Sequence, residues 1–101
     1  MTDTIDLIIE NLRTVYDPEI PVNIYDLGLI YHVNVDENKT ASIIMTLTAP
    51  GCPVADVLVE NVRQAALSAQ GVNDAYVELT FDPPWEKSMM SEEARLELGY
   101  F

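Results

Sequence analysis

The sequence is poor in the residues that build most enzyme and metal sites. Its 101 residues include one cysteine and one histidine. A single cysteine cannot form an internal disulfide, which agrees with a reducing compartment and leaves Cys52 as a free thiol. A metal site closed within one chain is disfavoured, because Cys52 and His32 together supply only two of the four ligands that such sites usually have.

Basic residues are also scarce. Five Lys and Arg residues stand against seventeen Asp and Glu residues, which gives a net charge of −12. This charge repels polyanions, so nucleic acids and anionic membranes are disfavoured as partners. Two interpretations stay open: the charge keeps a small domain soluble, or it complements a partner that has a basic docking surface.

Long apolar runs are absent as well. No stretch approaches the ~20 apolar residues that span a bilayer. The first six residues carry acid where a secretory signal carries base. We therefore expect one cytoplasmic globular domain over residues 1–101 that does not bind a membrane.

Helical spacing of apolar residues predicts three helices. The first covers residues 2–16 and ends because Asp17 precedes proline. The second follows Pro53 and ends near Gly71, and the third begins at Ser91 and ends near Gly99.

Alternating patterns predict three strands. Residues 29–36 and 41–48 form an antiparallel hairpin, with Ile30 and Ile44 on the less apolar face. Residues 75–81 form the third strand after a helical crossover, which makes it parallel to the second. The predicted fold is a small two-layer α+β domain of order α-β-β-α-β-α, with a three-stranded mixed sheet covered by helices on one side only.

Two aromatic features belong to this scheme. Residues 81–85 contain two prolines and are irregular, and we expect Phe81 and Trp85 to close the core. Ile30, Ile44 and Tyr76 share the mixed face of the sheet, which makes that face a candidate dimer surface, although scattered exposed apolar residues are normal.

Residues 48–53 are the stretch with the most chemical promise. Pro53 suits the first position of a helix, so Cys52 falls at or beside the N-cap. Unpaired backbone N–H groups and the helix dipole favour the thiolate there, the form that attacks electrophiles and binds metals. A buried, inert cysteine is the alternative.

Carboxylates form the second candidate feature. Asp17 and Glu19 are bracketed by Pro18 and Pro21 in a long loop, and such loops in compact domains are often functional. Taken alone the signal is weak, because acidic residues in so acidic a chain are usually solvated surface charges. Asp26, in the same loop, is as well explained by a turn or capping role.

Cysteine–histidine catalysis has little support. His32 lies mid-strand among polar neighbours, where we expect solvent exposure, and no orienting group is evident. A thiolate with carboxylates could bind one Zn²⁺ or Fe²⁺, but an iron-sulfur cluster needs about four thiolates. Subunits or a partner would have to supply the rest.

Two motifs taken together resemble a known family. Asp17-Pro18-Glu19 and the Thr48-x-x-x-Cys52 spacing, in this order, are similar to the SufT and PaaD type of metal-sulfur cluster assembly domain, also called the MIP18-like family. The segments 17–31, 45–53 and 81–99 carry the resemblance, which covers nearly the whole chain. PaaD-type relatives have an extra cysteine-bearing C-terminal region, so the end at Phe101 points to the stand-alone SufT-like branch.

The resemblance implies a domain without classical catalysis that helps to mature iron-sulfur proteins. It implies that Cys52 is the metal or cluster ligand, with Asp17, Glu19 and Thr48 around it. The cargo would be iron or an iron-sulfur cluster, held transiently and shared between chains of a possible homodimer or with a partner. The implied partners are iron-sulfur assembly or carrier proteins and client apoproteins.

Two other functions stay open from the residues alone. An acidic docking adaptor would recruit client or carrier proteins without touching metal. A thiol enzyme would use Cys52 as a nucleophile.

Overall fold

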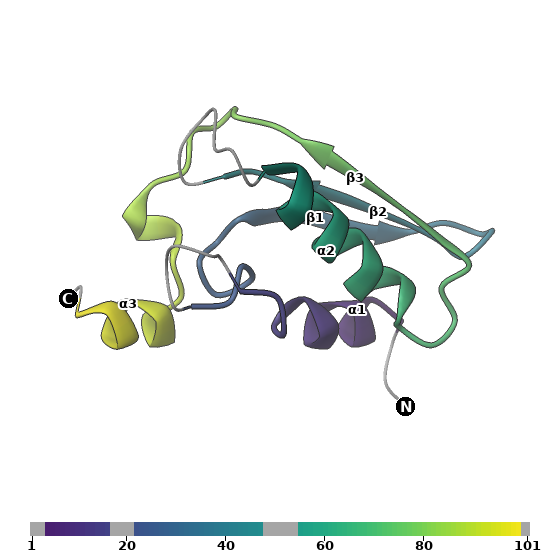
Figure 1. Ribbon diagram of the computed structural model, residues 1–101, viewed down its shortest axis with the longest axis horizontal. Helices are drawn as coiled ribbons and strands as arrows, with labels where there is room; N and C mark the ends of the chain where they lie inside the picture. The colour runs from purple at the N-terminus through teal and green to yellow at the C-terminus, as the bar shows by residue number, and fades with distance from the viewer. Residues whose placement is uncertain (1–3, 17–21, 48–54, 100–101) are drawn as a thin grey trace.

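A three-stranded sheet forms the back of the molecule (Figure 1). The computed structural model describes residues 4–16, 22–47 and 55–99. Strand β1 (Ile30–Val35) pairs antiparallel with β2 (Thr40–Met45), and β2 pairs parallel with β3 (Asp74–Leu79), in the order β1-β2-β3. The predicted mixed sheet is confirmed.

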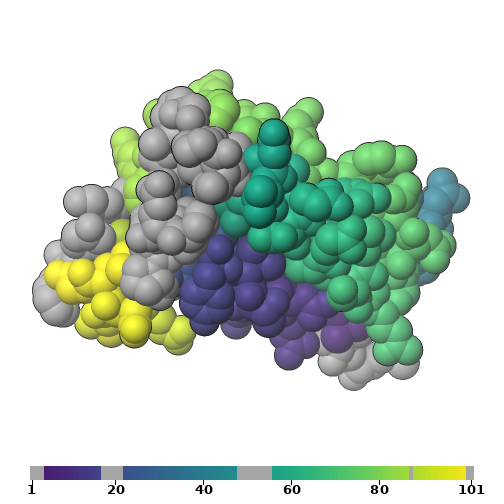
Figure 2. Space-filling model, in the orientation of Figure 1, coloured from purple at the N-terminus to yellow at the C-terminus, as the bar shows by residue number. Residues whose placement is uncertain are grey.

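Helices α1 (Thr4–Leu12) and α2 (Ala55–Leu67) lie side by side on one face of this sheet (Figures 1 and 2). Their apolar faces bury Ile8 and Leu12 from α1 and Leu58 and Val62 from α2, each at most 3% exposed. A short 3₁₀ helix, η1 (Lys87–Met89), and α3 (Glu92–Leu98) complete the order α-β-β-α-β-α. The predicted order is confirmed.

The other face of the sheet is open. Its side chains are largely polar and exposed, and none of the described helices covers them: His32, Asn34, Ser42, Tyr76 and Glu78. The prediction of one-sided coverage is confirmed. None of the described helices is long and apolar enough to cross a membrane.

Helix α1 ends earlier than predicted. It stops at Leu12 instead of continuing to residue 16. The Thr14 hydroxyl donates to the Asn11 carbonyl at 2.6 Å, and Val15 N–H reaches back only to Leu12. The Val15 carbonyl then accepts from Ile24, so tertiary pairing ends the helix before Pro18 can.

A bulge in β1 changes the predicted faces of the hairpin. Ile30 lies opposite Met45 and His32 opposite Ile44, so Tyr31 is the extra residue. Ile30 therefore packs on the core, on the helix side, and not beside Ile44 and Tyr76 as predicted.

The last part of the chain is better defined than its irregular sequence indicates. Ser91 caps α3 by accepting from Ala94 N–H at 3.1 Å, and Gly99 ends it at φ 80°, as predicted. Trp85 packs against the core as expected. Phe81 does not, because β3 ends at Leu79 and leaves Phe81 42% exposed.

Candidate functional site

The four predicted site residues, Asp17, Glu19, Thr48 and Cys52, lie outside the described residues. Their contacts with one another, and the position of Cys52 relative to the helix N-cap, stay predictions. The structure does describe the chain on both sides of each motif. Those flanking residues show where each motif leaves the fold.

The chain on either side of residues 17–21 is drawn together. Tyr16 and Asn23 form an antiparallel bridge, and Ile24 N–H donates to the Val15 carbonyl at 2.9 Å. Val22 is buried, with 5% of its surface exposed. The segment with Asp17 and Glu19 therefore starts and finishes at one place on the fold.

The other motif follows β2 and precedes α2. Thr46 N–H donates to the Leu29 carbonyl at 2.8 Å, and the Met45 carbonyl accepts from Thr80 at 2.8 Å. Leu47, just before Thr48, is 4% exposed. Helix α2 begins at Ala55, three residues after Cys52.

Three consecutive backbone hydrogen bonds join the two sets of flanking residues. The Val15 carbonyl accepts from Ile24, the Ile24 carbonyl accepts from Leu29, and the Leu29 carbonyl accepts from Thr46, at 2.8–3.1 Å. Both motifs therefore leave the fold at the same end of the sheet, where β2 ends and α2 begins (Figure 1).

Thr46 has an unusual environment at this end. It is completely buried, and its hydroxyl has no hydrogen-bond partner among the described residues. Leaving a buried hydroxyl unpaired costs about 1–3 kcal/mol. The alternation along β2 gave no signal of this burial, because it placed Thr46 on the more polar face.

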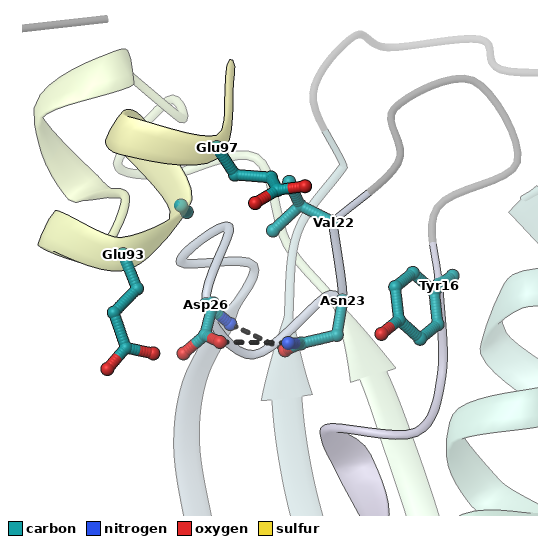
Figure 3. A pocket seen from close by; sticks show the side chains of 7 residues that line it. Tyr16, Val22, Asn23, Asp26, Glu93 and Glu97 are labelled. Atoms are coloured by element: carbon teal, nitrogen blue, oxygen red, sulfur yellow. Dashed lines mark hydrogen bonds between the residues drawn. The ribbon is translucent and has the colours of Figure 1, made fainter. Parts of the chain in front are cut away.

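Asp26 has a structural role in the turn after the first motif. Its backbone N–H donates to Asn23 Oδ1, and its Oδ2 accepts from the Asn23 amide, both at 2.8 Å (Figure 3). Arg13 Nε lies 3.9 Å from Asp26 Oδ1, and its guanidinium carbon lies 5.1 Å from the centre of the Tyr25 ring. The predicted turn role is confirmed.

A pocket of about 260 Å³ lies between this turn and α3 (Figure 3). The turn side is formed by Tyr16, Val22, Asn23 and Asp26. Helix α3 contributes Glu93, Ala94 and Glu97. Three carboxylates around one hollow attract cations, but sequence spacing gave no sign that α3 would meet residue 26.

The C-terminal segment, residues 80–98, is fastened to the loop before β1. Trp85 Nε1–H donates to the Leu27 carbonyl at 2.7 Å, and Ser91 N–H donates to the Asp26 carbonyl at 2.8 Å. The Tyr31 hydroxyl donates to the Pro83 carbonyl at 2.8 Å and lies 3.6 Å from Met89 Sδ. These bonds place α3 beside the first motif's flanking residues.

Gly28 permits this close approach. Its φ is 83°, and a Cβ there would overlap the Met89 carbonyl oxygen. Any other residue has a Cβ, which would disfavour the positive φ and would clash with Met89. Glycine has no Cβ and avoids both problems. The sequence shows that a glycine ends an irregular loop at this position. It does not show which segment packs against that glycine.

The described residues contain no ready-made metal site. Among residues 4–16, 22–47 and 55–99, no group of three or more His, Cys, Asp or Glu side chains is arranged to hold a metal ion. His32 is exposed on β1, as expected.

Comparisons with known proteins agree with the motifs. Residues 5–79 match the family described as "Iron-sulfur cluster assembly protein". The chain is 58% identical, over 92% of its length and 89% of the relative's, to a protein of Porphyromonas gingivalis named Fe-S protein maturation auxiliary factor. It is 39% identical to the Fe-S protein maturation auxiliary factor SufT of Staphylococcus aureus, over 84% of this chain and 97% of that protein.

The fold also has a solved counterpart. A crystal structure from Bacillus anthracis, described as a domain of unknown function DUF59, superposes with a TM-score of 0.90 at 40% identity. The match covers 95% of this chain and 92% of that one.

Proposed function

Because the chain belongs to the iron-sulfur cluster assembly protein family, we propose that it is an accessory factor in the maturation of iron-sulfur proteins. In this proposal it binds iron or a labile cluster as cargo through Cys52 and passes the cargo to client proteins. The names of its relatives, which are maturation factors, support a role without catalysis.

One observation carries the placement of the site. The flanking residues of both motifs are joined by consecutive backbone hydrogen bonds, so the motifs leave the fold at the same end of the sheet. This supports a site in which Asp17 and Glu19 approach Cys52 although more than thirty positions separate them in the sequence.

The chemistry follows from the types of residue. A thiolate is a soft ligand that binds the iron of iron-sulfur clusters, and the nearby start of α2 would favour its charged form. Asp17 and Glu19 would add oxygen ligands to iron. The Thr48 hydroxyl would donate a hydrogen bond to a cluster sulfide. One thiolate cannot satisfy a cluster that needs about four, so a second copy or a partner supplies the others.

Anaerobic reconstitution tests direct binding. The protein is incubated with ferrous iron and sulfide and desalted, and its visible absorption and its iron content are measured. We expect sulfur-to-iron charge-transfer bands for the wild type and none for Cys52→Ala. Equal, negligible signals in both proteins would remove direct ligation by Cys52.

Carboxylate variants test the shared site separately. Asp17→Asn and Glu19→Gln should retain less iron than the wild type. Glu37→Gln is the matched control, because Glu37 is an exposed carboxylate in the β1–β2 turn. Equal iron retention by all three variants would show that the carboxylates of Asp17 and Glu19 do not contribute to iron binding.

An acidic docking adaptor is the second candidate function. The net charge of −12 favours it, because that charge steers basic partners toward the chain. Capture of an iron-sulfur carrier protein that survives Cys52→Ala but weakens steeply between 50 and 500 mM salt would support the adaptor.

A further inference from the structure

Strand β1 is an open edge of the sheet. It pairs with β2 on one side only, and none of its six residues is fully buried. Among the described residues, only β2 hydrogen-bonds to the backbone of residues 30–35. An edge of this kind presents a row of main-chain donors and acceptors to another extended chain.

The register identifies which groups face outward. Asp36 N–H donates to the Thr40 carbonyl at 3.1 Å, so Asp36 directs its backbone toward β2. Alternate residues of an antiparallel strand face the same way. Asn34 and His32 therefore also bond toward β2, while the N–H and C=O groups of Val33 and Val35 face away from the sheet.

The opposite edge of the sheet is protected, and β1 is not. Arg63 covers β3, because its Nε donates to the Ala75 carbonyl at 3.1 Å. Strand β3 also carries Asp74 and Glu78, charges of the kind that blunt natural edges. Strand β1, with the sequence IYHVNV, contains no Asp, Glu, Lys, Arg, Pro or Gly.

A groove runs beside this open edge. It has a volume of about 230 Å³ and lies between α1 and β1. Ile5 and Ile9 of α1 form one wall of the groove. Ile30 and Val33 of β1 form the other wall, and Tyr25 also lines the groove. Alternate side chains of an added strand would point toward this apolar surface.

The charged residues next in sequence to the groove-lining segments are mainly acidic. Exposed carboxylates come directly after Ile5 and Ile9 in α1 and directly after the last residue of β1. They are Asp6, Glu10, Asp36 and Glu37. Two cations are near in sequence, Lys39 and Arg13, and Arg13 lies 3.9 Å from the Asp26 carboxylate. The surroundings therefore favour a basic chain.

We propose that β1 is a docking edge for an extended segment of a partner protein, with alternating apolar side chains and flanking lysine or arginine residues. The segment adds a fourth strand by bonding to Val33 and Val35, and its apolar side chains enter the groove against α1. This mode of peptide binding obtains affinity from main-chain bonds and specificity from alternate side chains. Net charge favours a basic partner over a second copy of this chain at this edge, because two copies would each bring −12 to the contact.

Synthetic peptides test this edge without any variant of the protein. The probe is a fluorescein-labelled nine-residue peptide in which valine alternates with lysine and threonine. One control peptide has the same charge but its valines are grouped together. Two further controls are N-methylated at every second backbone amide, one at the odd-numbered and one at the even-numbered positions. Fluorescence anisotropy at 150 mM salt should show at least about tenfold tighter binding of the probe, or about 1.4 kcal/mol.

Amide hydrogen exchange locates the bound peptide. Exchange at Val33 and Val35 should slow when the probe is saturating, while exchange along β3 stays the same. Val33→Lys should weaken binding more than Tyr76→Lys, which adds the same charge on the open face of β3. If Val33→Lys does not fold, the peptide controls still decide.

Three results would overturn the proposal. Equal affinity of all the peptides would reduce the interaction to charge alone. Protection at β3 in place of β1 would assign the wrong edge. A dimer in sedimentation that protects Val33 and Val35 without peptide would identify a second copy as the occupant. Because the test uses no iron, its failure leaves the role of Cys52 untouched.

Discussion

Gly28 and Gly99 show how different two residues of similar backbone conformation can be. Their φ values are 83° and 80°. A Cβ on Gly28 would overlap Met89, whereas a Cβ on Gly99 would meet no atom of the described residues within 4 Å. The pair therefore separates the cost of a left-handed backbone from the cost of a lost close approach.

Gly28→Ala should destabilise the protein by at least about 3 kcal/mol, while Gly99→Ala should cost about 1–2 kcal/mol. Both variants carry the cost of a positive φ, and only the first must also move η1 and its Met89. Urea denaturation at equal protein concentration measures both free energies of unfolding. Equal losses would mean that the contact between Gly28 and Met89 adds nothing.

Thr46→Val should raise the free energy of unfolding by about 1 kcal/mol. Valine has nearly the same shape as threonine, and the buried hydroxyl has no partner among the described residues. Thr46→Ser keeps the hydroxyl, removes the methyl group and should lower stability by about 1 kcal/mol. A destabilised Thr46→Val, measured by thermal unfolding, would reveal a hydrogen bond that this hydroxyl makes in solution.

At the scale of elements, the periodic parts of the chain were predictable and the contacts between them were not. The order of helices and strands followed from periods of two and 3.6, and Ser91 and Gly99 marked both ends of α3. The bulge residue Tyr31 bonds to Pro83, and the chain just after α1 bonds to Ile24, and both partners are distant from β1 or α1 in sequence. No local pattern encodes such partners.

The candidate site divides in the same way. Residue types and spacing predict a chemistry for Cys52 and the carboxylates, and this chemistry stays a prediction because these residues lie outside the described part of the chain. The placement of α3 beside residues 23 and 26 could not, because it depends on Gly28, Trp85 and the bond from Ser91 to Asp26. Tertiary contacts, and not local propensity, decide what surrounds the residues that flank the first motif.

The attachment of the C-terminal segment can be measured. Trp85→Phe keeps most of the packing but leaves the buried Leu27 carbonyl unpaired, so we expect a loss of about 1–3 kcal/mol in the free energy of unfolding. Tyr31→Phe removes a more exposed bond to Pro83 and should cost less than about 1 kcal/mol. A Trp85→Phe protein as stable as the wild type in urea would contradict this role.

At the scale of the whole molecule, charge is the dominant feature. Seventeen acidic residues repel one another in the folded state more strongly than in the expanded chain. The folded state contains few compensating pairs among the described residues, and those of Arg63 and Arg13 are at least partly exposed. Such pairs contribute little.

Raising sodium chloride from 20 to 200 mM should therefore increase the free energy of unfolding. Over this range the screening length falls to below about 10 Å, which damps repulsion between surface carboxylates. Potassium chloride should have the same effect, because the cause is ionic strength. Stability that stays constant or falls with added salt would show that the acidic surface costs nothing.

The bonds that fasten the C-terminal segment have one more property. Trp85, Tyr31 and Ser91 all donate to main-chain carbonyls, those of Leu27, Pro83 and Asp26. A main-chain acceptor is present whatever side chain the residue carries. Sequence drift at positions 26, 27 and 83 can thus proceed without removing these acceptors, whereas the side-chain donors Trp85 and Tyr31 have no such freedom.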